Sequence, residues 1–170
     1  LYQRGKEGLL MSFVNDFTIP LVAGEPYYYL GLVNVAQQFV FEAMEAVPDY
    51  RKSVRCFKRL AETNLINGRY EVARKYLRIL QHTLFYKDWA TETLACLNDE
   101  DRVNAHPEYG RLRRLTPRTD FFFNPDLPEM TLEFLLHANP RNRMAYEYLM
   151  ACTLLKKDVG RFEIGRASCR

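Results

Sequence analysis

Residues 54–87 have the sequence VRCFKRLAETNLINGRYEVARKYLRILQHTLFYK, in which two helical patterns flank a glycine turn. Apolar residues recur at steps of three and four, the spacing that places side chains on one face of an α-helix. In the first half this face is formed by Val54, Phe57, Leu60, Ala61 and Leu65, and in the second half by Ala73, Leu77, Leu80 and Leu84. Between them, Asn67-Gly68 ends the first helix, because glycine adopts the left-handed conformation that closes a helix without a Cβ penalty.

Two amphipathic helices joined by so short a turn form an antiparallel hairpin. The pattern predicts helices over 53–66 and 70–84. Their facing side chains should form a core, and the residues that we expect to be buried are Phe57, Leu60, Ala61, Ala73, Leu77 and Leu80. Ala61 and Ala73 are small enough to let the two helices cross closely.

The same period extends in both directions along the chain and predicts an all-α fold with no β-sheet. The further helices that we expect lie at 35–47, 86–97, 128–138 and 142–157, with a weak helix at 1–14 and a short one that starts near Pro107. Two prolines and Gly24 predict a loop from Asp16 to Pro26. We also expect a polar break at 98–101 and an apolar loop at 120–128.

Residues 54–87 resemble the tetratricopeptide repeat, a helical hairpin of 34 residues. Phe57 stands at the large aromatic position of its first helix, Leu60-Ala61 at the crossing pair, and Ala73 at the small position of its second helix. Weaker copies of the repeat occur at two other places. One includes Leu30-Gly31 and would have a shortened first helix, and the other begins near Pro140. The resemblance implies one domain over 1–162, with hairpins stacked into a short right-handed superhelix. The alternative is an irregular helical bundle.

Longer phrases resemble an uncharacterised family of bacterial membrane proteins, in which a multi-span N-terminal part precedes a helical region. The phrases are Arg59–Gly68, Tyr70–Leu77, Asn104–Pro107 and Asn142–Ala151, and the match runs from near Tyr2 to about Phe162. The resemblance implies a bacterial protein tethered to a membrane through a segment that precedes Leu1. It implies no chemistry, because the family has no assigned activity.

The two ends of the sequence lead to separate predictions. Leu1 stands where a complete protein would begin with Met, and the helical pattern is already under way, which predicts a piece of a longer protein. Residues 163–170 break all periodicity and predict a non-native or disordered tail. No apolar run approaches the ~18 residues that a membrane-spanning helix needs, so we expect no direct membrane insertion of this segment.

Charge and motifs exclude several function classes. The net charge of +3 is small, and the tyrosines of the basic stretch 51–80 occupy packing positions, which argues against nucleic-acid binding. The sequence has no glycine-rich phosphate loop, nucleophile elbow or H-E-x-x-H motif. Glu133 and His137 share a helix face but lack two further ligands for a metal. We therefore predict no catalytic residue, no cofactor and no metal, and a protein that is not an enzyme.

The hypothesis that remains is a protein-interaction scaffold with a groove lined by the first helices of the repeats. The positions that would line it are Arg55, Lys58, Glu62 and Leu65, and in a final repeat Arg143, Tyr146 and Met150. Cations on such a wall favour an acidic protein or peptide partner. In the alternative, Lys58 and Glu62 only pair along their helix. The competing function is an accessory region of a membrane enzyme whose catalytic residues lie in the preceding part.

Overall fold

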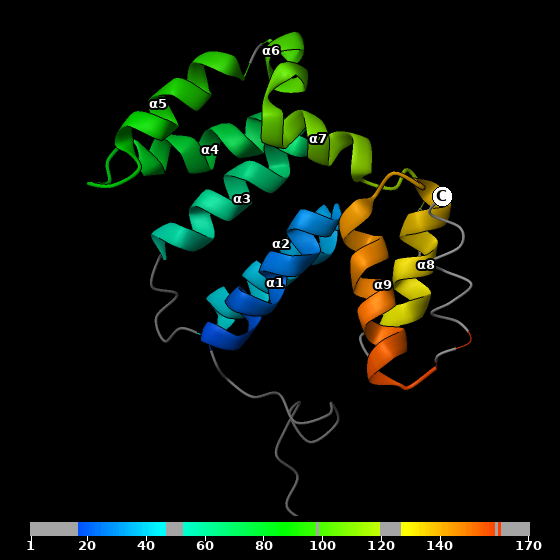
Figure 1. Cartoon of the computed structure of the whole chain (residues 1–170). Coiled ribbons are helices and arrows are strands. Elements are labelled where there is room, and N and C mark those ends of the chain that lie inside the picture. The colour runs from blue at the N-terminus through cyan, green and yellow to red at the C-terminus, as the bar shows by residue number, and fades with distance from the viewer. Residues whose placement is uncertain (1–16, 47–52, 98, 120–126, 159, 161–170) are drawn as a thin grey trace, which may run out of the picture.

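The computed structural model describes residues 17–46, 53–97, 99–119, 127–158 and 160, and every regular element in these ranges is an α-helix (Figure 1). The all-α prediction is therefore confirmed for the described part of the chain. The helices are α1 (Thr18–Leu30), α2 (Val33–Glu45), α3 (Val54–Ile66), α4 (Tyr70–Leu80), α5 (Lys87–Cys96), α6 (Glu100–Ala105), α7 (Pro107–Leu115), α8 (Pro128–Ala138) and α9 (Arg143–Leu155). The predictions for residues 1–14, for most of the loop at 120–128 and for the tail at 163–170 fall outside the described residues.

Helices α3 and α4 form the hairpin that the sequence predicts. The hydroxyl of Ser53 accepts a hydrogen bond from the amide of Cys56 and so caps the start of α3. Gly68 has a φ of +72°, and the amide of Arg69 then donates to the carbonyl of Asn64 at 2.8 Å. All six residues predicted for this core are buried, with exposed fractions of 5% or less.

The predicted loop from Asp16 to Pro26 is wrong, because α1 is a helix over most of it. Pro20 lies in the first turn, where a backbone N–H has no partner to lose. Pro26 stands inside the helix, at the cost of one backbone hydrogen bond. Burial offsets this cost: Leu21 and Tyr28 are buried, and the backbone at Gly24 lies so close to α2 that a Cβ there would be 3.1 Å from the Cβ of Phe39.

Three local predictions need correction. Leu30-Gly31 is not a crossing pair within a helix; Gly31 has a φ of +91° and forms the turn between α1 and α2. Helix α4 ends at Leu80, where the hydroxyl of Thr83 donates to the Leu80 carbonyl at 2.7 Å, and Leu84 lies outside the core. The polar break at 98–101 contains the start of α6, because the Asp99 side chain accepts from the amide of Arg102.

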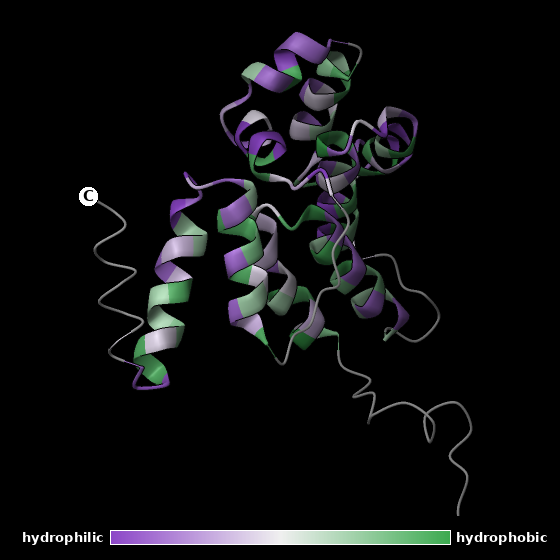
Figure 2. Ribbon diagram, turned by 90° about the vertical axis from the view of Figure 1, so that its right-hand side faces the viewer, coloured by the Kyte–Doolittle hydropathy of each residue, from purple (hydrophilic) through white to green (hydrophobic). Residues whose placement is uncertain are grey.

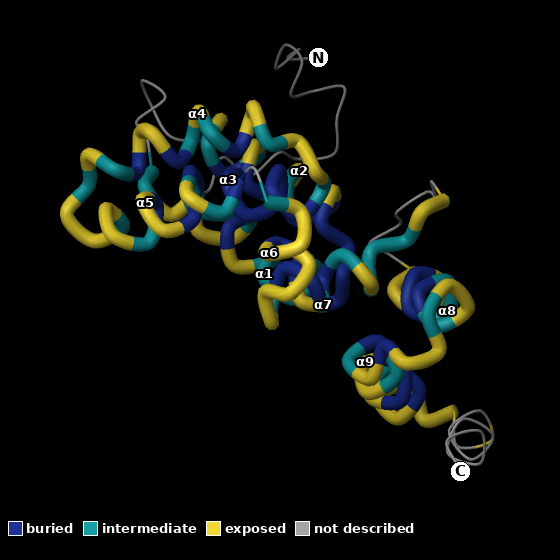
Figure 3. Tube along the Cα trace, turned by 90° about the horizontal axis from the view of Figure 1, so that it is seen from above, coloured by how far each residue is buried: buried dark blue, intermediate teal, exposed yellow. Residues whose placement is uncertain are grey.

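The buried side chains form two clusters. The larger one is built from helices α1 to α7, and the smaller one joins α8 and α9 to Leu30, Leu32 and Val35 at the turn between α1 and α2. Buried and exposed stretches alternate along each helix, as do apolar and polar residues (Figures 2 and 3). Asn142 joins α9 to the end of α1: its Nδ2 donates to the Leu30 carbonyl at 2.9 Å, and its Oδ1 caps α9. No helix in the described ranges is long and apolar enough to span a membrane.

Gly68 gives the first test of the fold. A Cβ at this position would meet nothing within 4 Å, so only the positive φ opposes a side chain there. Gly68→Val should lower the free energy of unfolding by about 1 kcal/mol or more, because a β-branched residue fits the left-handed region poorly. Gly68→Asn is the matched control and should cost less, since asparagine tolerates that region. Urea unfolding followed by circular dichroism measures both, and equal stability of the valine variant and the parent would contradict the turn.

Candidate functional site

Arg113, in the last turn of α7, joins four segments of the chain. Its guanidinium donates to the carbonyls of Ile66 at 3.0 Å and Leu65 at 2.9 Å, both in the last turn of α3. It also donates to the hydroxyl of Tyr70 at 2.7 Å and to the Asn104 side chain at 2.9 Å, and it pairs with Glu100. The side chain is only 14% exposed. Arg113 therefore fixes α7 against α3, α4 and α6.

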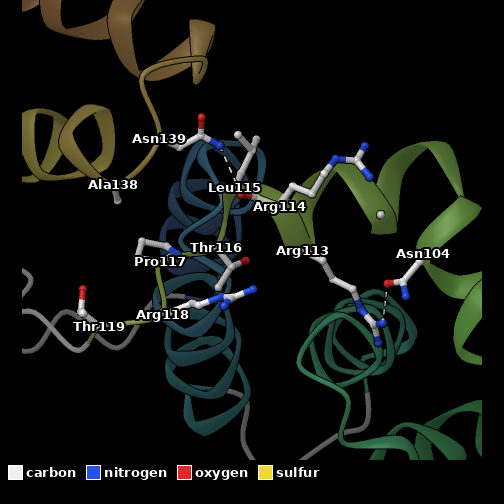
Figure 4. Close-up of a pocket in the computed structure, with 11 residues that line it drawn as sticks. Asn104, Arg113, Arg114, Leu115, Thr116, Pro117, Arg118, Thr119, Ala138 and Asn139 are labelled. Atoms are coloured by element: carbon white, nitrogen blue, oxygen red, sulfur yellow. Dashed lines mark hydrogen bonds between the residues drawn. The ribbon is translucent and has the colours of Figure 1, made fainter.

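Beside Arg113 lies a cleft of about 650 Å³ between the end of α7 and the turn that follows α8 (Figure 4). We call it the arginine cleft. Its lining residues are Asn104, Gly110, Arg113, Arg114, Leu115, Thr116, Pro117, Arg118, Thr119, Ala138 and Asn139. Among the described residues, the lining contains three arginines but neither a carboxylate nor an aromatic ring.

The charges of the cleft are unbalanced. Arg113 is paired with Glu100, but Arg114 and Arg118 are exposed, and no ion pair is found for either of them among the described residues. In Figure 4 the Arg118 side chain extends across the cleft beside Thr116. Two exposed guanidinium groups without carboxylate partners produce a positive potential, and the walls of a cleft focus it. The site is therefore suited to an anionic group.

Close backbone contacts hold the walls of the cleft in place. A Cβ on Gly110 would lie 1.9 Å from the Asn104 carbonyl oxygen, so only glycine allows α6 and α7 to meet in this way. Asn139 donates from Nδ2 to the Arg114 carbonyl at 3.2 Å. A second hollow of about 170 Å³ shares Thr116, Pro117 and Thr119 with the arginine cleft and reaches residues 31–35. The two hollows are neighbouring parts of one depression.

On α3, the predicted groove residues Lys58 and Glu62 lie in a buried charge network. Glu62 is only 4% exposed, and its carboxylate pairs with Lys58 at 2.6 Å and with Arg59 at 2.9 Å. Arg59 also pairs with Glu25 of α1 at 2.5 Å, and its guanidinium carbon lies 3.6 Å from the centre of the Tyr28 ring. The pairing of Lys58 with Glu62, which the sequence left as an alternative to binding, is present.

The network continues to α7 through Tyr28, whose hydroxyl donates to Glu108 at 2.9 Å. Burial raises the pKa of Tyr28 above its ordinary value, and Glu62 and Glu108 raise it further. Burial also raises the pKa of the Glu62 carboxyl, against the opposing effect of Arg59 and Lys58. These groups form an internal tie between α1, α3 and α7.

The predicted groove residues do not form one surface. Arg55 is exposed and Lys58 is half-buried, whereas Glu62 and Leu65 are buried beneath neighbouring helices. On α9, Arg143 is exposed and pairs with Glu147 at 2.7 Å, Tyr146 is half-buried, and Met150 is buried in the smaller cluster. A partner could reach only the exposed members of either set, so binding through Arg55 or Arg143 stays a prediction.

Sequence reasoning missed the arginine cleft, although a signal was present. The stretch RLRRLTPR, residues 111–118, carries four arginines and no acid. Over residues 81–170 as a whole the positive and negative charges balance, which hides this local excess. Cations in the last turn of a helix also have an ordinary role, since they offset the helix dipole. Among the described residues, no group of three or more His, Cys, Asp or Glu side chains could hold a metal ion.

Comparison with known proteins places the chain in one family. The model of DUF6057, a family of unknown function, matches residues 1–164, and the chain belongs to this family. No curated protein and no solved structure gives a match. The family covers the arginine cleft and the buried network alike, and it assigns no activity to either.

The raised pKa of Glu62 gives a prediction with a definite sign. Unfolded Glu62 titrates near its ordinary pKa of 4.5, and in the folded chain the pKa is higher, so ionisation costs the folded state more than the unfolded state. The stability that this group contributes is present below pH 4.5 and is lost as the pH rises through the folded pKa. The free energy of unfolding of the parent should therefore fall relative to that of Glu62→Gln as the pH rises from 4.5 toward neutrality.

Urea unfolding at a series of pH values measures this difference. Glu147→Gln is the matched control, because the Glu147 side chain is 54% exposed and its ion pair with Arg143 lies on the surface. The prediction would be contradicted if the parent became more stable relative to Glu62→Gln as the pH rises. That result would show that Lys58 and Arg59 lower the pKa of Glu62 by more than burial raises it.

Proposed function

We propose that this chain is an interaction scaffold that binds an acidic segment of a protein partner in the arginine cleft. The observation that carries the proposal is the set of exposed guanidinium groups on Arg114 and Arg118 in a cleft whose described lining residues include no carboxylate. Arginine binds carboxylates through two parallel hydrogen bonds, which gives geometric selectivity as well as attraction. The rigid setting of Arg113 and Gly110 reduces the conformational cost of binding.

The shape and lining of the cleft support a peptide as the ligand. The depression continues from the arginine cleft to the turn between α1 and α2, which suits an extended chain. Side chains of Asn104 and Thr119, which line the cleft, can hydrogen-bond to a peptide backbone. A single-stranded nucleic acid is less favoured, because the lining residues that the structure describes include no aromatic ring on which a base could stack.

The proposal retains the acidic partner that the sequence suggests and moves the contact away from α3. The resemblance of residues 54–87 to a repeat used in protein binding supports the scaffold role. Membrane tethering through a preceding segment stays a prediction of the sequence resemblance, and the cleft and its test do not depend on it.

The test is fluorescence anisotropy of a labelled deca-glutamate peptide titrated with the 170-residue chain. Replacing two arginines by alanine removes two charge-assisted contacts, so Arg114→Ala with Arg118→Ala should weaken binding by about tenfold or more. Lys75→Ala with Arg78→Ala, on the exposed side of α4, removes the same net charge and should leave the affinity within about twofold, the small effect expected of distant screened charges.

Two results would contradict the proposal. Equal weakening by both pairs would show that only net charge attracts the peptide. A labelled oligothymidine that binds more tightly than deca-glutamate, with the same loss in the Arg114 and Arg118 variant, would assign the cleft to nucleic acid.

A further inference from the structure

The turn between α4 and α5 exposes two large apolar side chains at neighbouring positions. Leu84 is 88% exposed and Phe85 is 86% exposed, the highest values among the large hydrophobic residues of the described chain. The turn lies at the edge of the molecule opposite α8 and α9, as two views show (Figures 1 and 3). Folding gains nothing from leaving such side chains in water, so the pair is a candidate contact with something outside the chain.

The turn that carries the pair is held by specific contacts. The Thr83 hydroxyl donates to the carbonyl of Leu80, and Gln81 donates to the Thr91 hydroxyl of α5 at 3.1 Å. Directly after the pair, the Tyr86 and Trp89 rings meet edge to face at 6.4 Å between centres. The two apolar side chains are therefore presented on an ordered, convex tip.

Cations flank this tip on both helices. Lys75 and Arg78 are exposed along α4, and Lys87 is exposed at the start of α5. From residue 69 to residue 88 the chain carries five cations and two carboxylates. One of the carboxylates, Glu71, is already paired with Arg74. The surroundings of the tip therefore carry an excess of positive charge.

We propose that this tip docks onto an anionic lipid surface, with Leu84 and Phe85 entering the headgroup boundary and the flanking cations contacting the lipid phosphates. A convex apolar tip surrounded by cations is complementary to a flat, negatively charged boundary, and both attractions add. Tyr86 and Trp89 fit the same place, because rings with one polar end favour the membrane interface. The contact is peripheral and requires no helix to span the bilayer. It uses a different surface from the arginine cleft and does not rest on that proposal.

Sedimentation of the 170-residue chain with vesicles tests the docking. We use vesicles of equal parts phosphatidylcholine and phosphatidylglycerol, and vesicles of phosphatidylcholine alone. The parent should bind the anionic vesicles at least about tenfold more strongly, and high salt should weaken this binding, because exposed charges are screened. Leu84→Ser with Phe85→Ser should lower the partition coefficient by about tenfold or more, through the lost apolar burial.

The chain offers matched controls for both attractions. Leu154 and Leu155 are another exposed apolar pair, 52% and 84% exposed, and Leu154→Ser with Leu155→Ser should bind like the parent. Lys75→Glu with Arg78→Glu should weaken binding to the anionic vesicles only, whereas Arg114→Ala with Arg118→Ala should change it little. Circular dichroism confirms that each variant keeps its helices.

Three outcomes would overturn the proposal. The first is a parent chain that does not sediment with anionic vesicles, and the second is a Leu84 and Phe85 variant that binds like the parent. The third is an equal loss in both serine pairs. Any of these would rule out docking onto lipid, and the exposed tip would then be assigned to the apolar pocket of a protein partner.

Discussion

The hydrogen bonds of one side chain, Arg113, hold α7 against α3, α4 and α6, and the arginine cleft depends on the position of α7. Its guanidinium donates to two carbonyls in the last turn of α3, where the regular backbone hydrogen bonds of a helix run out. The same group reaches Tyr70 of α4 and Asn104 of α6. Only arginine offers five donors in a fixed planar arrangement, so no other side chain could satisfy all these acceptors at once.

The position of α7 affects the packing on both of its sides. On one side, Tyr28 and Glu108 connect α7 to the buried charges around Glu62. On the other side, a Cβ on Gly31 would lie 2.7 Å from the Cβ of Leu115, so the turn between α1 and α2 rests against the end of α7. Asn142 then joins α9 to the same turn. The arginine cleft is formed where these segments meet, and its walls depend on the contacts that fix α7.

Local patterns predicted the parts of the fold that depend on neighbouring residues. The hairpin of α3 and α4 follows from its apolar period and from Gly68, and its core is buried as expected. Helix α1 could not be predicted in this way, because Pro26 opposes it locally and its stability comes from packing against α2. The charge network around Glu62 likewise includes a distant contact, because Arg59 pairs with Glu25, 34 residues away in the sequence.

Local sequence patterns predicted even less of the candidate site. The arginines of residues 111–118 are visible in the sequence as a run of charge, but their separate roles are not. Arg113 is half-buried and donates to carbonyls 47 and 48 residues away, whereas its neighbour Arg114 is exposed. A one-residue step on a helix turns a side chain to a different face, and the partners on that face come from distant segments. The resemblance to a repeat placed the groove on α3, where Glu62 is buried and Arg59 contacts Glu25 and Tyr28 of α1.

The most direct test of this account is the stability of Arg113→Lys measured by urea unfolding, with Arg111→Lys as the matched control on the same helix. Lysine keeps the charge but cannot reach the carbonyls of α3, Tyr70 and Asn104 together. The account predicts that Arg113→Lys lowers the free energy of unfolding by about 1.5–3 kcal/mol, the range for hydrogen bonds to a charged group, at an unchanged dependence on urea concentration. Arg111→Lys should stay within about 0.5 kcal/mol of the parent, as surface substitutions do. An Arg113→Lys chain as stable as the parent would contradict the central role of this side chain.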